Sequence, residues 1–148
     1  MADHPDADPD TGEHAGWVVV DMSATLLHHG HIRILRFATT LGPVRVALAT
    51  DDEIRRWKGY EPELPFAARK EILEAIRYVD DVVPSPWVIT DEYLDSIDGR
   101  VLVHGEDNAN PVTRHEIVIV PRTEGISSAD MRERAQTNMT SRTPETTA

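Results

Sequence analysis

Short apolar runs alternate along this chain with segments of helical periodicity, and this alternation constrains the fold more than any other feature. Residues 17 to 20 are all apolar, and residues 44 to 49 are apolar apart from one arginine. Runs of this length are typical of strands buried on both faces. Between them, apolar residues recur at helical spacing over residues 31 to 41, and Gly42 and Pro43 then supply a stop signal.

The alternation continues to residue 135. We expect helices over residues 66 to 79, 90 to 97 and 127 to 135, and strands over residues 81 to 83, 101 to 103 and 117 to 120. Such alternation favours right-handed crossovers and a parallel sheet covered on both faces. The sequence therefore predicts an α/β fold, a Rossmann-like doubly wound parallel sheet of about five strands in a single domain. Ligands bind such sheets at the carboxyl ends of the strands.

The two ends of the chain differ from its middle. Residues 1 to 16 are rich in Asp, Pro, His and Gly without periodicity, which is typical of a disordered acidic leader. Residues 136 to 148 are Thr-rich, and we expect a tail or a linker there. The folded domain is therefore expected over residues 17 to 135.

Charge and composition exclude several classes of protein. The formal net charge is −11, and five of the acidic residues lie in the leader. A nucleic-acid partner is not expected, because phosphate backbones bind basic surfaces. The chain has no cysteine, so a metal would need oxygen or imidazole ligands. No apolar run approaches the ~20 residues that span a bilayer, and the acidic start does not resemble a signal peptide, so we expect a cytoplasmic protein without membrane contact.

Histidines cluster where the first strand leads into the first helix. His28 and His31 are three residues apart, so both can face one point at the start of the helix. Gly30 lets a ligand approach the backbone, and the first-turn N–H groups with the helix dipole favour an anion there. The pattern favours a phosphate site, but histidines that cap the helix or face solvent would give the same spacing.

A second junction between strand and helix lies at residues 121 to 128, with the sequence PRTEGISS. Ser127 is a candidate N-cap with Asp130 in the capping-box position, and this accounts for both residues without a ligand. It does not account for Arg122 or Gly125. Two helix starts suited to anions in one sheet favour a phosphate-binding site.

Together these junctions resemble the cytidylyltransferase branch of the cytidylyl- and adenylyltransferase superfamily. His28, Gly30 and His31 match its H-x-G-H signature, and residues 122 to 128 match the R-T-x-G-I-S-[ST] element. Residues 69 to 82 are similar to a stretch of the glycerol-3-phosphate cytidylyltransferases. The resemblance covers residues 17 to 135. It implies an enzyme, a homodimer, that transfers CMP from CTP to a small phosphonic or phosphoric acid and releases pyrophosphate.

The resemblance also implies roles for single residues. His28 and His31 would donate hydrogen bonds to the α-phosphate, Lys58 would neutralise both substrates, and Arg122 would hold the β- and γ-phosphates. An acceptor acid that is already anionic needs no general base, so the work is positioning and charge stabilisation. The nucleotide is further expected to contact Met22, Ser23, Ala24, Gly30, Thr123, Gly125, Ile126, Ser127 and Ser128.

Four more positions complete the expected site. Arg77 is a candidate triphosphate ligand near a dimer contact. Gly105 and Asp107 are expected to contact the nucleotide, with Asp107 as a candidate acceptor from the cytosine amino group. Lys58, in the loop expected after the second strand, and Trp87 would lie on the acceptor side with Ser23 and Ala24. An ordinary surface position for Arg77, Lys58 and Asp107, and ordinary packing for Trp87, stay open.

The segment before the histidines narrows the resemblance. Met22-Ser23-Ala24 is similar to the M-S-A-D of cytidylyltransferase domains fused to phosphoenolpyruvate phosphomutase in the biosynthesis of phosphonate antibiotics such as fosfomycin. This likeness implies 2-hydroxyethylphosphonate as the acceptor and a phosphomutase domain downstream in the same protein. Thr25 replaces the family Asp that helps to hold Mg²⁺, and a hydroxyl is a weaker ligand. We therefore expect Mg²⁺ to be held mainly by the triphosphate, without a metal ligand from the protein.

Three alternatives are left open. The chain could be an adenylyltransferase, because those enzymes share H-x-G-H and a late I-S-S segment. It could be a cytidylyltransferase for glycerol 3-phosphate or a similar alcohol phosphate. Because of Thr25, it could also be a nucleotide-binding module without activity.

Overall fold

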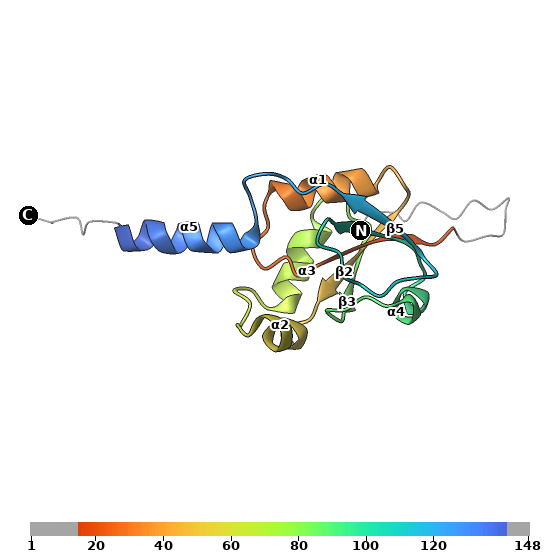
Figure 1. Ribbon diagram of the computed structural model, residues 1–148, viewed down its shortest axis with the longest axis horizontal. Coiled ribbons are helices and arrows are strands. Elements are labelled where there is room, and N and C mark those ends of the chain that lie inside the picture. The colour runs from red at the N-terminus through yellow and green to blue at the C-terminus, as the bar shows by residue number, and fades with distance from the viewer. Residues whose placement is uncertain (1–14, 142–148) are drawn as a thin grey trace, which may run out of the picture.

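The computed structural model describes residues 15 to 141, and Figure 1 shows the arrangement of its elements. Nearly all of the expected leader and the last seven residues of the expected tail lie outside this range. The strands of the described part are β1 (Trp17–Met22), β2 (Val44–Ala49), β3 (Asp81–Ser85), β4 (Gly99–Gly105) and β5 (Glu116–Val120). The helices are α1 (His29–Ala38), α2 (Asp51–Lys58), α3 (Phe66–Glu74), α4 (Asp91–Ser96) and α5 (Ser128–Ser141).

The strands form one parallel sheet in the order β3-β2-β1-β4-β5. Strand order reverses between β1 and β4, so the crevice at their carboxyl ends is the point where such folds bind ligands. The predicted Rossmann-like α/β sheet is therefore confirmed. No helix in the described range is both long and apolar enough to cross a membrane.

The central strands β1, β2 and β4 are buried on both faces of the sheet, which is why they appear in the sequence as apolar runs. Val18 and Val20 of β1 pack on one face with α1 and α3, while Trp17 and Val19 pack on the other face with α4. Figure 1 shows α1 and α4 on opposite sides of the sheet. Side chains that alternate between two apolar layers stabilise the centre of the sheet, and this leaves the strand ends for function.

Helix α2 replaces the loop that the sequence predicts after β2, so the expectation that Lys58 lies in a loop is wrong. Thr50 caps the helix by accepting the N–H of Glu53 at 3.3 Å, and Gly59 ends it with φ of 75°. Ile54 is its single buried residue, so the segment has no apolar stripe to reveal the helix. Local capping decides this element.

Helix α3 ends at Glu74, five residues before the predicted end. Asp80 donates its N–H to Val44 O at 3.0 Å and accepts the N–H of Val44 on its carboxylate at 2.8 Å. These bonds fix the chain at the amino end of β2, so it leaves the helix early to enter β3. Residues 75 to 79 form turns, and their larger apolar side chains pack against the core.

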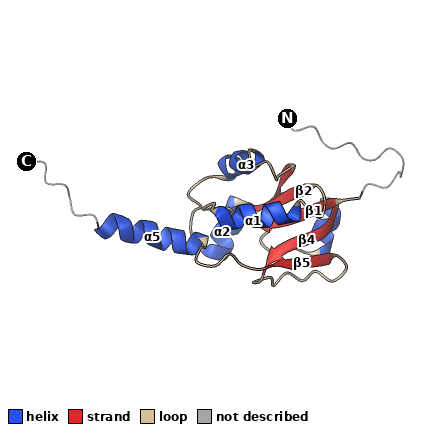
Figure 2. Cartoon of the chain, turned by 90° about the horizontal axis from the view of Figure 1, so that it is seen from above, coloured by secondary structure: helices blue, strands red, loops and turns tan. Residues whose placement is uncertain are grey.

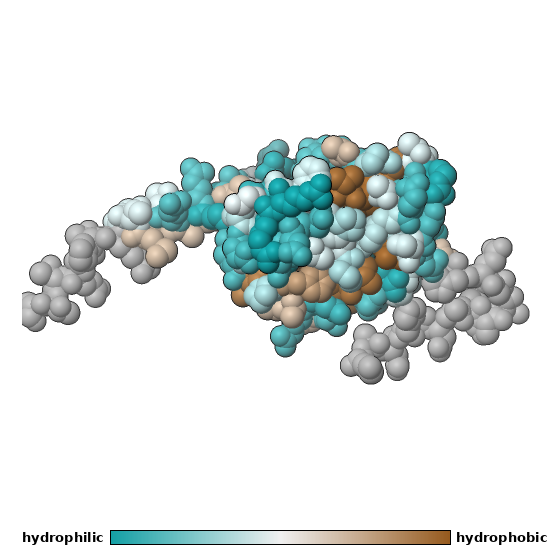
Figure 3. Space-filling model, turned by 90° about the horizontal axis from the view of Figure 1, so that it is seen from below, coloured by the Kyte–Doolittle hydropathy of each residue, from teal (hydrophilic) through white to brown (hydrophobic). Residues whose placement is uncertain are grey.

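Helix α5 continues past residue 135 to Ser141, into the segment expected as a tail. None of its residues is buried. Figures 1 and 2 both show it extending away from the sheet, and in Figure 3 its described part carries no broad hydrophobic area. The expected boundary at residue 135 therefore falls inside one continuous helix.

Candidate active site

A cavity of about 600 Å³ opens at the carboxyl ends of the strands, where the fold predicts a ligand site. Strands β1, β2, β3 and β4 and helix α2 all contribute to its wall. Of the residues singled out from the sequence, the wall contains Met22, Ser23, His31, Lys58, Trp87, Gly105 and Asp107. Side chains up to 85 positions apart in the chain therefore meet around one space.

His28 and His31 form a reciprocal cap at the start of α1. The Nδ1 atom of His28 accepts the N–H of Gly30 at 3.0 Å, and the Nδ1 atom of His31 accepts the N–H of His28 at 3.2 Å. The two ring centroids are 4.1 Å apart. The capping interpretation is thus correct for both residues. Capping does not compete with a role at the phosphates, because it occupies only Nδ1.

The cap also sets which nitrogen carries the proton. A neutral imidazole whose Nδ1 accepts a hydrogen bond has its proton on Nε2. Burial, together with the charge of His28, lowers the pKa of His31 to about 4. Burial and the neighbouring His29 and Arg122 lower the pKa of His28. Both rings are therefore neutral Nε2–H donors at neutral pH, which suits them to stabilise a phosphate oxygen and not to act as general acids.

Gly30 is needed for the cap itself. A Cβ atom at this position would lie 2.7 Å from Cε1 and 2.8 Å from Nδ1 of the His28 ring. Glycine is therefore required at position 30 because the ring of His28 packs directly against its Cα atom. The expectation that Gly30 admits a ligand to the backbone is not needed to explain it.

The segment from Arg122 to Ser128 lies against the histidine loop. Ser128 donates its hydroxyl to Leu26 O at 2.9 Å, and Thr123 Cβ would lie 3.5 Å from a Cβ on Gly30. The charge of Arg122 contributes to the lowered pKa of His28. Ser127 caps α5 by accepting the N–H of Asp130 at 3.0 Å, as predicted. The structure brings the two predicted motifs together beside the cavity, although residues 122 to 128 are not on its wall.

Lys58 and Trp87 meet on the side of the cavity formed by β2 and β3. The Nζ atom of Lys58 lies 5.2 Å from the centroid of the Trp87 ring, within the range of a cation–π contact. Glu53 holds this wall together, because its Oε2 atom accepts the Trp87 N–H at 2.9 Å and the Trp57 indole N–H at 3.1 Å. A cation beside an aromatic ring, in the same cavity as the neutral ring of His31, is suited to a small acidic acceptor.

Thr25, at the position of the family's metal-holding Asp, and Ala24, which was expected to contact the nucleotide and the acceptor, both turn inward. Thr25 is buried, and its Oγ1 atom has no hydrogen-bond partner in the described chain. Ala24 is also buried, with φ of 50°, a conformation that L residues rarely adopt. Neither lies on the cavity wall. No group of three metal-ligating side chains occurs within residues 15 to 141, so this part of the protein supplies no cage of its own for Mg²⁺.

Arg77 lies far from the cavity in one subunit. It is exposed, its guanidinium is 5.7 Å from the Tyr78 ring, and it precedes β3. Parallel strands have all their amino ends at one edge, and the cavity is at the other. The predicted contact of Arg77 with the triphosphate is therefore not made at this cavity within one chain.

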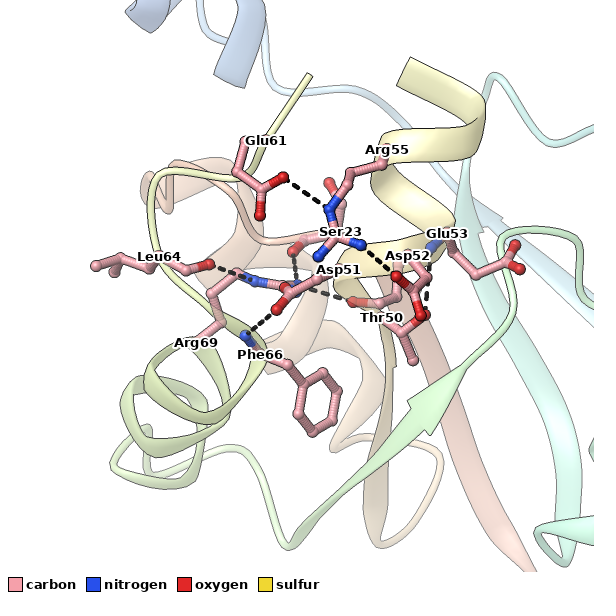
Figure 4. Close-up of polar contacts among 11 residues, drawn as sticks. Ser23, Thr50, Asp51, Asp52, Glu53, Arg55, Glu61, Leu64, Phe66 and Arg69 are labelled. Carbon is pink, nitrogen blue, oxygen red and sulfur yellow. Dashed lines mark hydrogen bonds and ion pairs between the residues drawn. The ribbon is translucent and has the colours of Figure 1, made fainter. Parts of the chain in front are cut away.

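Sequence reasoning missed Arg69, which is 1% exposed and supports the floor of the site. Figure 4 shows its guanidinium among the loops after β1 and β2. It donates to Ser23 O at 2.7 Å, to Ala49 O at 2.9 Å and to the Asp51 carboxylate at 2.6 Å. Burial opposes ionisation of Asp51, but the bonds from Arg69 and the Phe66 N–H outweigh it and lower the Asp51 pKa. The sequence did contain a signal for this role, because Arg69 is a charged residue at the spacing of the apolar stripe of its helix.

Sequence reasoning also missed Asp21 and His104 on the cavity wall. They come from the carboxyl ends of β1 and β4, and His104 Nδ1 lies 2.5 Å from Asp21 Oδ1. Their place before Met22 and Gly105 in two buried strands was a signal, because polar side chains at strand ends face the ligand crevice.

Comparison with known proteins agrees with this geometry. A family described as cytidylyltransferase-like matches residues 24 to 134. Glycerol-3-phosphate cytidylyltransferase of Bacillus subtilis is 36% identical over 113 residues, which are 73% of this chain and 88% of that enzyme. FAD synthase of Pyrococcus abyssi is 39% identical over 92 residues, which are 61% of this chain and 62% of that enzyme. A lipopolysaccharide core biosynthesis protein from Thermoplasma volcanium has the same fold, with a TM-score of 0.63 and 18% identity over 72% of this chain and 97% of that chain.

Proposed function

Because the chain belongs to the cytidylyltransferase-like family, we propose that it transfers CMP from MgCTP to a small phosphonate, 2-hydroxyethylphosphonate, and releases pyrophosphate. It is an enzyme of the nucleotidyltransferase type. The observation that carries the proposal is the pair of neutral Nε2–H donors of His28 and His31 beside a cavity whose other wall holds Lys58.

The proposed reaction needs no base. A phosphonate oxygen attacks the α-phosphorus, the bond from this phosphorus to the bridging oxygen breaks, and pyrophosphate leaves with the electron pair. The nucleophile is already anionic, so the protein contributes positioning and charge stabilisation. His28 and His31 donate to the α-phosphate as charge builds, Lys58 brings the acceptor close, and Arg122 with the first N–H groups of α5 holds the leaving group.

The acceptor end of the proposal has its own support. Met22 and Ser23 belong to the M-S-A segment that resembles the phosphonate enzymes, and both line the cavity. A phosphonate and a phosphate present nearly the same oxygens to Lys58, so discrimination must come from the carbon end. A homodimer is also part of the proposal, because a second subunit would give Arg77 a nucleotide to contact. The proposal also includes a phosphomutase domain in the same protein. It places the enzyme in the cytoplasm, where CTP is made.

The experiment is a matrix of two nucleotides and three acceptors. Pyrophosphate release is followed with MgCTP or MgATP in the presence of 2-hydroxyethylphosphonate, glycerol 3-phosphate or phosphoethanolamine. The proposal expects the highest kcat/KM with CTP and 2-hydroxyethylphosphonate. If glycerol 3-phosphate or phosphoethanolamine were turned over faster, cytidylyl transfer would stand and the proposed acceptor would be wrong.

A second candidate is adenylyl transfer from ATP, which the likeness to FAD synthase favours. Its reaction centre would use the same two histidines, so the two candidates differ only in the nucleobase of the substrate, cytosine or adenine. Preference for ATP in the matrix establishes this candidate. Binding of CTP in a thermal-shift titration without pyrophosphate release would identify a module that binds nucleotide and does not turn over.

A further inference from the structure

Asp21 and His104 form a polar pair in the wall of the cavity, on the two central strands of the sheet. The side chains are 11% and 19% exposed, and Asp21 Oδ1 lies 2.5 Å from His104 Nδ1. Within residues 15 to 141 this is the single hydrogen bond of the Asp21 side chain, so its Oδ2 atom is free to accept another. None of the roles assigned above uses either residue.

The fold does not explain the pair. The backbones of β1 and β4 are paired with each other in register from Val18 to Val20, without help from these side chains. Taking a carboxylate out of water costs stability unless hydrogen bonds compensate, and apolar residues would close the sheet end more cheaply. A partly desolvated carboxylate with one free oxygen, aimed at a cavity, is suited to binding a ligand group.

We propose that Asp21, held by His104, is a specificity-determining residue that accepts a hydrogen bond from a hydroxyl group at the carbon end of the acceptor. The inference rests on the proposed function and deepens it. Asp21 shares the cavity with Lys58, so one short molecule can present its acid group to the lysine and its hydroxyl to the carboxylate. Ser85, from the end of β3, lines the same cavity.

The pair favours a neutral donor over an ammonium group. Burial alone would lower the pKa of His104, but the hydrogen bond and charge of Asp21 and the charge of Asp107 raise it overall. The raised pKa favours the imidazolium form of His104, whose charge offsets that of the Asp21 carboxylate 2.5 Å away. Asp107 lies 3.5 Å from Nε2 of the same ring, but its side chain is 93% exposed, so water screens its charge. The remaining oxygen of Asp21 then gains little from a second cation, whereas it still accepts a hydroxyl hydrogen bond.

The test compares acceptors that differ only in this hydroxyl. Pyrophosphate release with CTP is measured for 2-hydroxyethylphosphonate, ethylphosphonate and 2-aminoethylphosphonate, and for 2-hydroxyethyl phosphate against ethyl phosphate. Wild-type enzyme should prefer each hydroxyl acceptor over its ethyl analogue by about 10- to 100-fold in kcat/KM, the value of one hydrogen bond to a charged group. It should also prefer 2-hydroxyethylphosphonate over 2-aminoethylphosphonate.

Two variants test the contact. Asp21→Asn removes the charge but keeps an amide oxygen that can accept a hydrogen bond. The double variant Asp21→Leu with His104→Met replaces both partners by apolar groups so that no buried charge is left alone. The double variant should lower kcat/KM for the hydroxyl acceptors to the level of the ethyl analogues, and Asp21→Asn should lower it less. Neither should change the value for the analogues or the Kd for CTP. Glu106→Gln, an exposed carboxylate in the same loop that does not line the cavity, is the control and should behave as wild type.

Each other outcome overturns the inference in its own way. Equal loss for hydroxyl and ethyl acceptors would assign the pair to structure, and a weakened Kd for CTP would assign it to the nucleotide. Preference for 2-aminoethylphosphonate would make it a cation site. Wild-type turnover without discrimination between hydroxyl and ethyl acceptors defeats the inference while the proposed function stands. Absence of pyrophosphate release with every acceptor defeats the proposed function itself.

Discussion

The side chain of His31 accepts the backbone N–H of His28 at 3.2 Å, so the residue that caps α1 is held by the residue one turn along. His28 in turn accepts the N–H of Gly30. This exchange fixes both rings with Nε2 free. The H-x-G-H spacing is therefore a capping device that leaves one nitrogen of each ring unused.

Capping and chemistry can be separated at His28. Asparagine is among the best N-caps but lacks the Nε2–H donor, so His28→Asn should keep stability and lower kcat by roughly 10²- to 10³-fold. His28→Ala should lose the same activity and also about 0.5 to 2 kcal/mol of stability. Single-turnover kinetics and urea unfolding measure the two effects. His29→Ala is the control, because His29 is exposed; a loss there equal to that of His28→Ala would refute the assignment.

Acid should destabilise the fold through His31. The folded pKa is about 4, below the ordinary value of 6.5, so between these values the unfolded chain binds more protons and stability falls as pH falls. The loss attributable to His31 from pH 7 to pH 5 is on the order of 2 kcal/mol. Urea unfolding at both pH values should show a smaller drop for His31→Gln than for wild type. Parallel curves would show that His31 is not held neutral.

Arg69→Met should destabilise the protein by roughly 3 to 5 kcal/mol, because it removes the donor to Asp51 Oδ1 and to three carbonyl oxygens. The same substitution at Arg33, which is exposed on α1, should cost less than about 0.5 kcal/mol. Chemical denaturation measures both. Equal stability of the two variants would mean that Arg69 does not support the site.

Lys58→Ala should raise the KM for the acceptor about 10- to 100-fold, since a charge-assisted contact to a phosphonate is lost. Arg56→Ala removes a neighbouring exposed charge from the same helix and should change the KM little. Steady-state pyrophosphate release provides the comparison. If both variants lost affinity to the same degree, the effect would be one of general charge and not of position.

Arg122→Ala should weaken CTP binding by about 1.5 to 3 kcal/mol, the value of a hydrogen bond to a charged group. Calorimetric titration of CTP gives the Kd directly. Arg36→Ala, an exposed arginine in the last turn of α1, serves as the matched control. An unchanged Kd in Arg122→Ala would remove this residue from the site.

Much of the architecture could be predicted because it depends on short-range pattern. Apolar runs identify strands buried on both faces, and all five appear where they were expected, with ends that differ by a few residues. Helix α2 could not be found in this way, because its Thr50 cap and Gly59 end act without an apolar stripe. The early end of α3 depends on Asp80 meeting Val44, 36 residues away in sequence, and no local window contains that contact.

For the candidate site, the sequence by itself identified the two junctions for which a phosphate role is predicted, because H-x-G-H and R-T-x-G-I-S-S are local combinations of cap, glycine and charge. Only the tertiary structure decided which residues share a cavity. It placed Lys58 over Trp87, separated Arg77 from both, buried Thr25, and joined Asp21 to His104 across two strands. The physical reason is that strand order in a parallel sheet is set by crossovers and packing of whole elements. The residues that meet at the strand ends are therefore distant in sequence, and no spacing rule relates them.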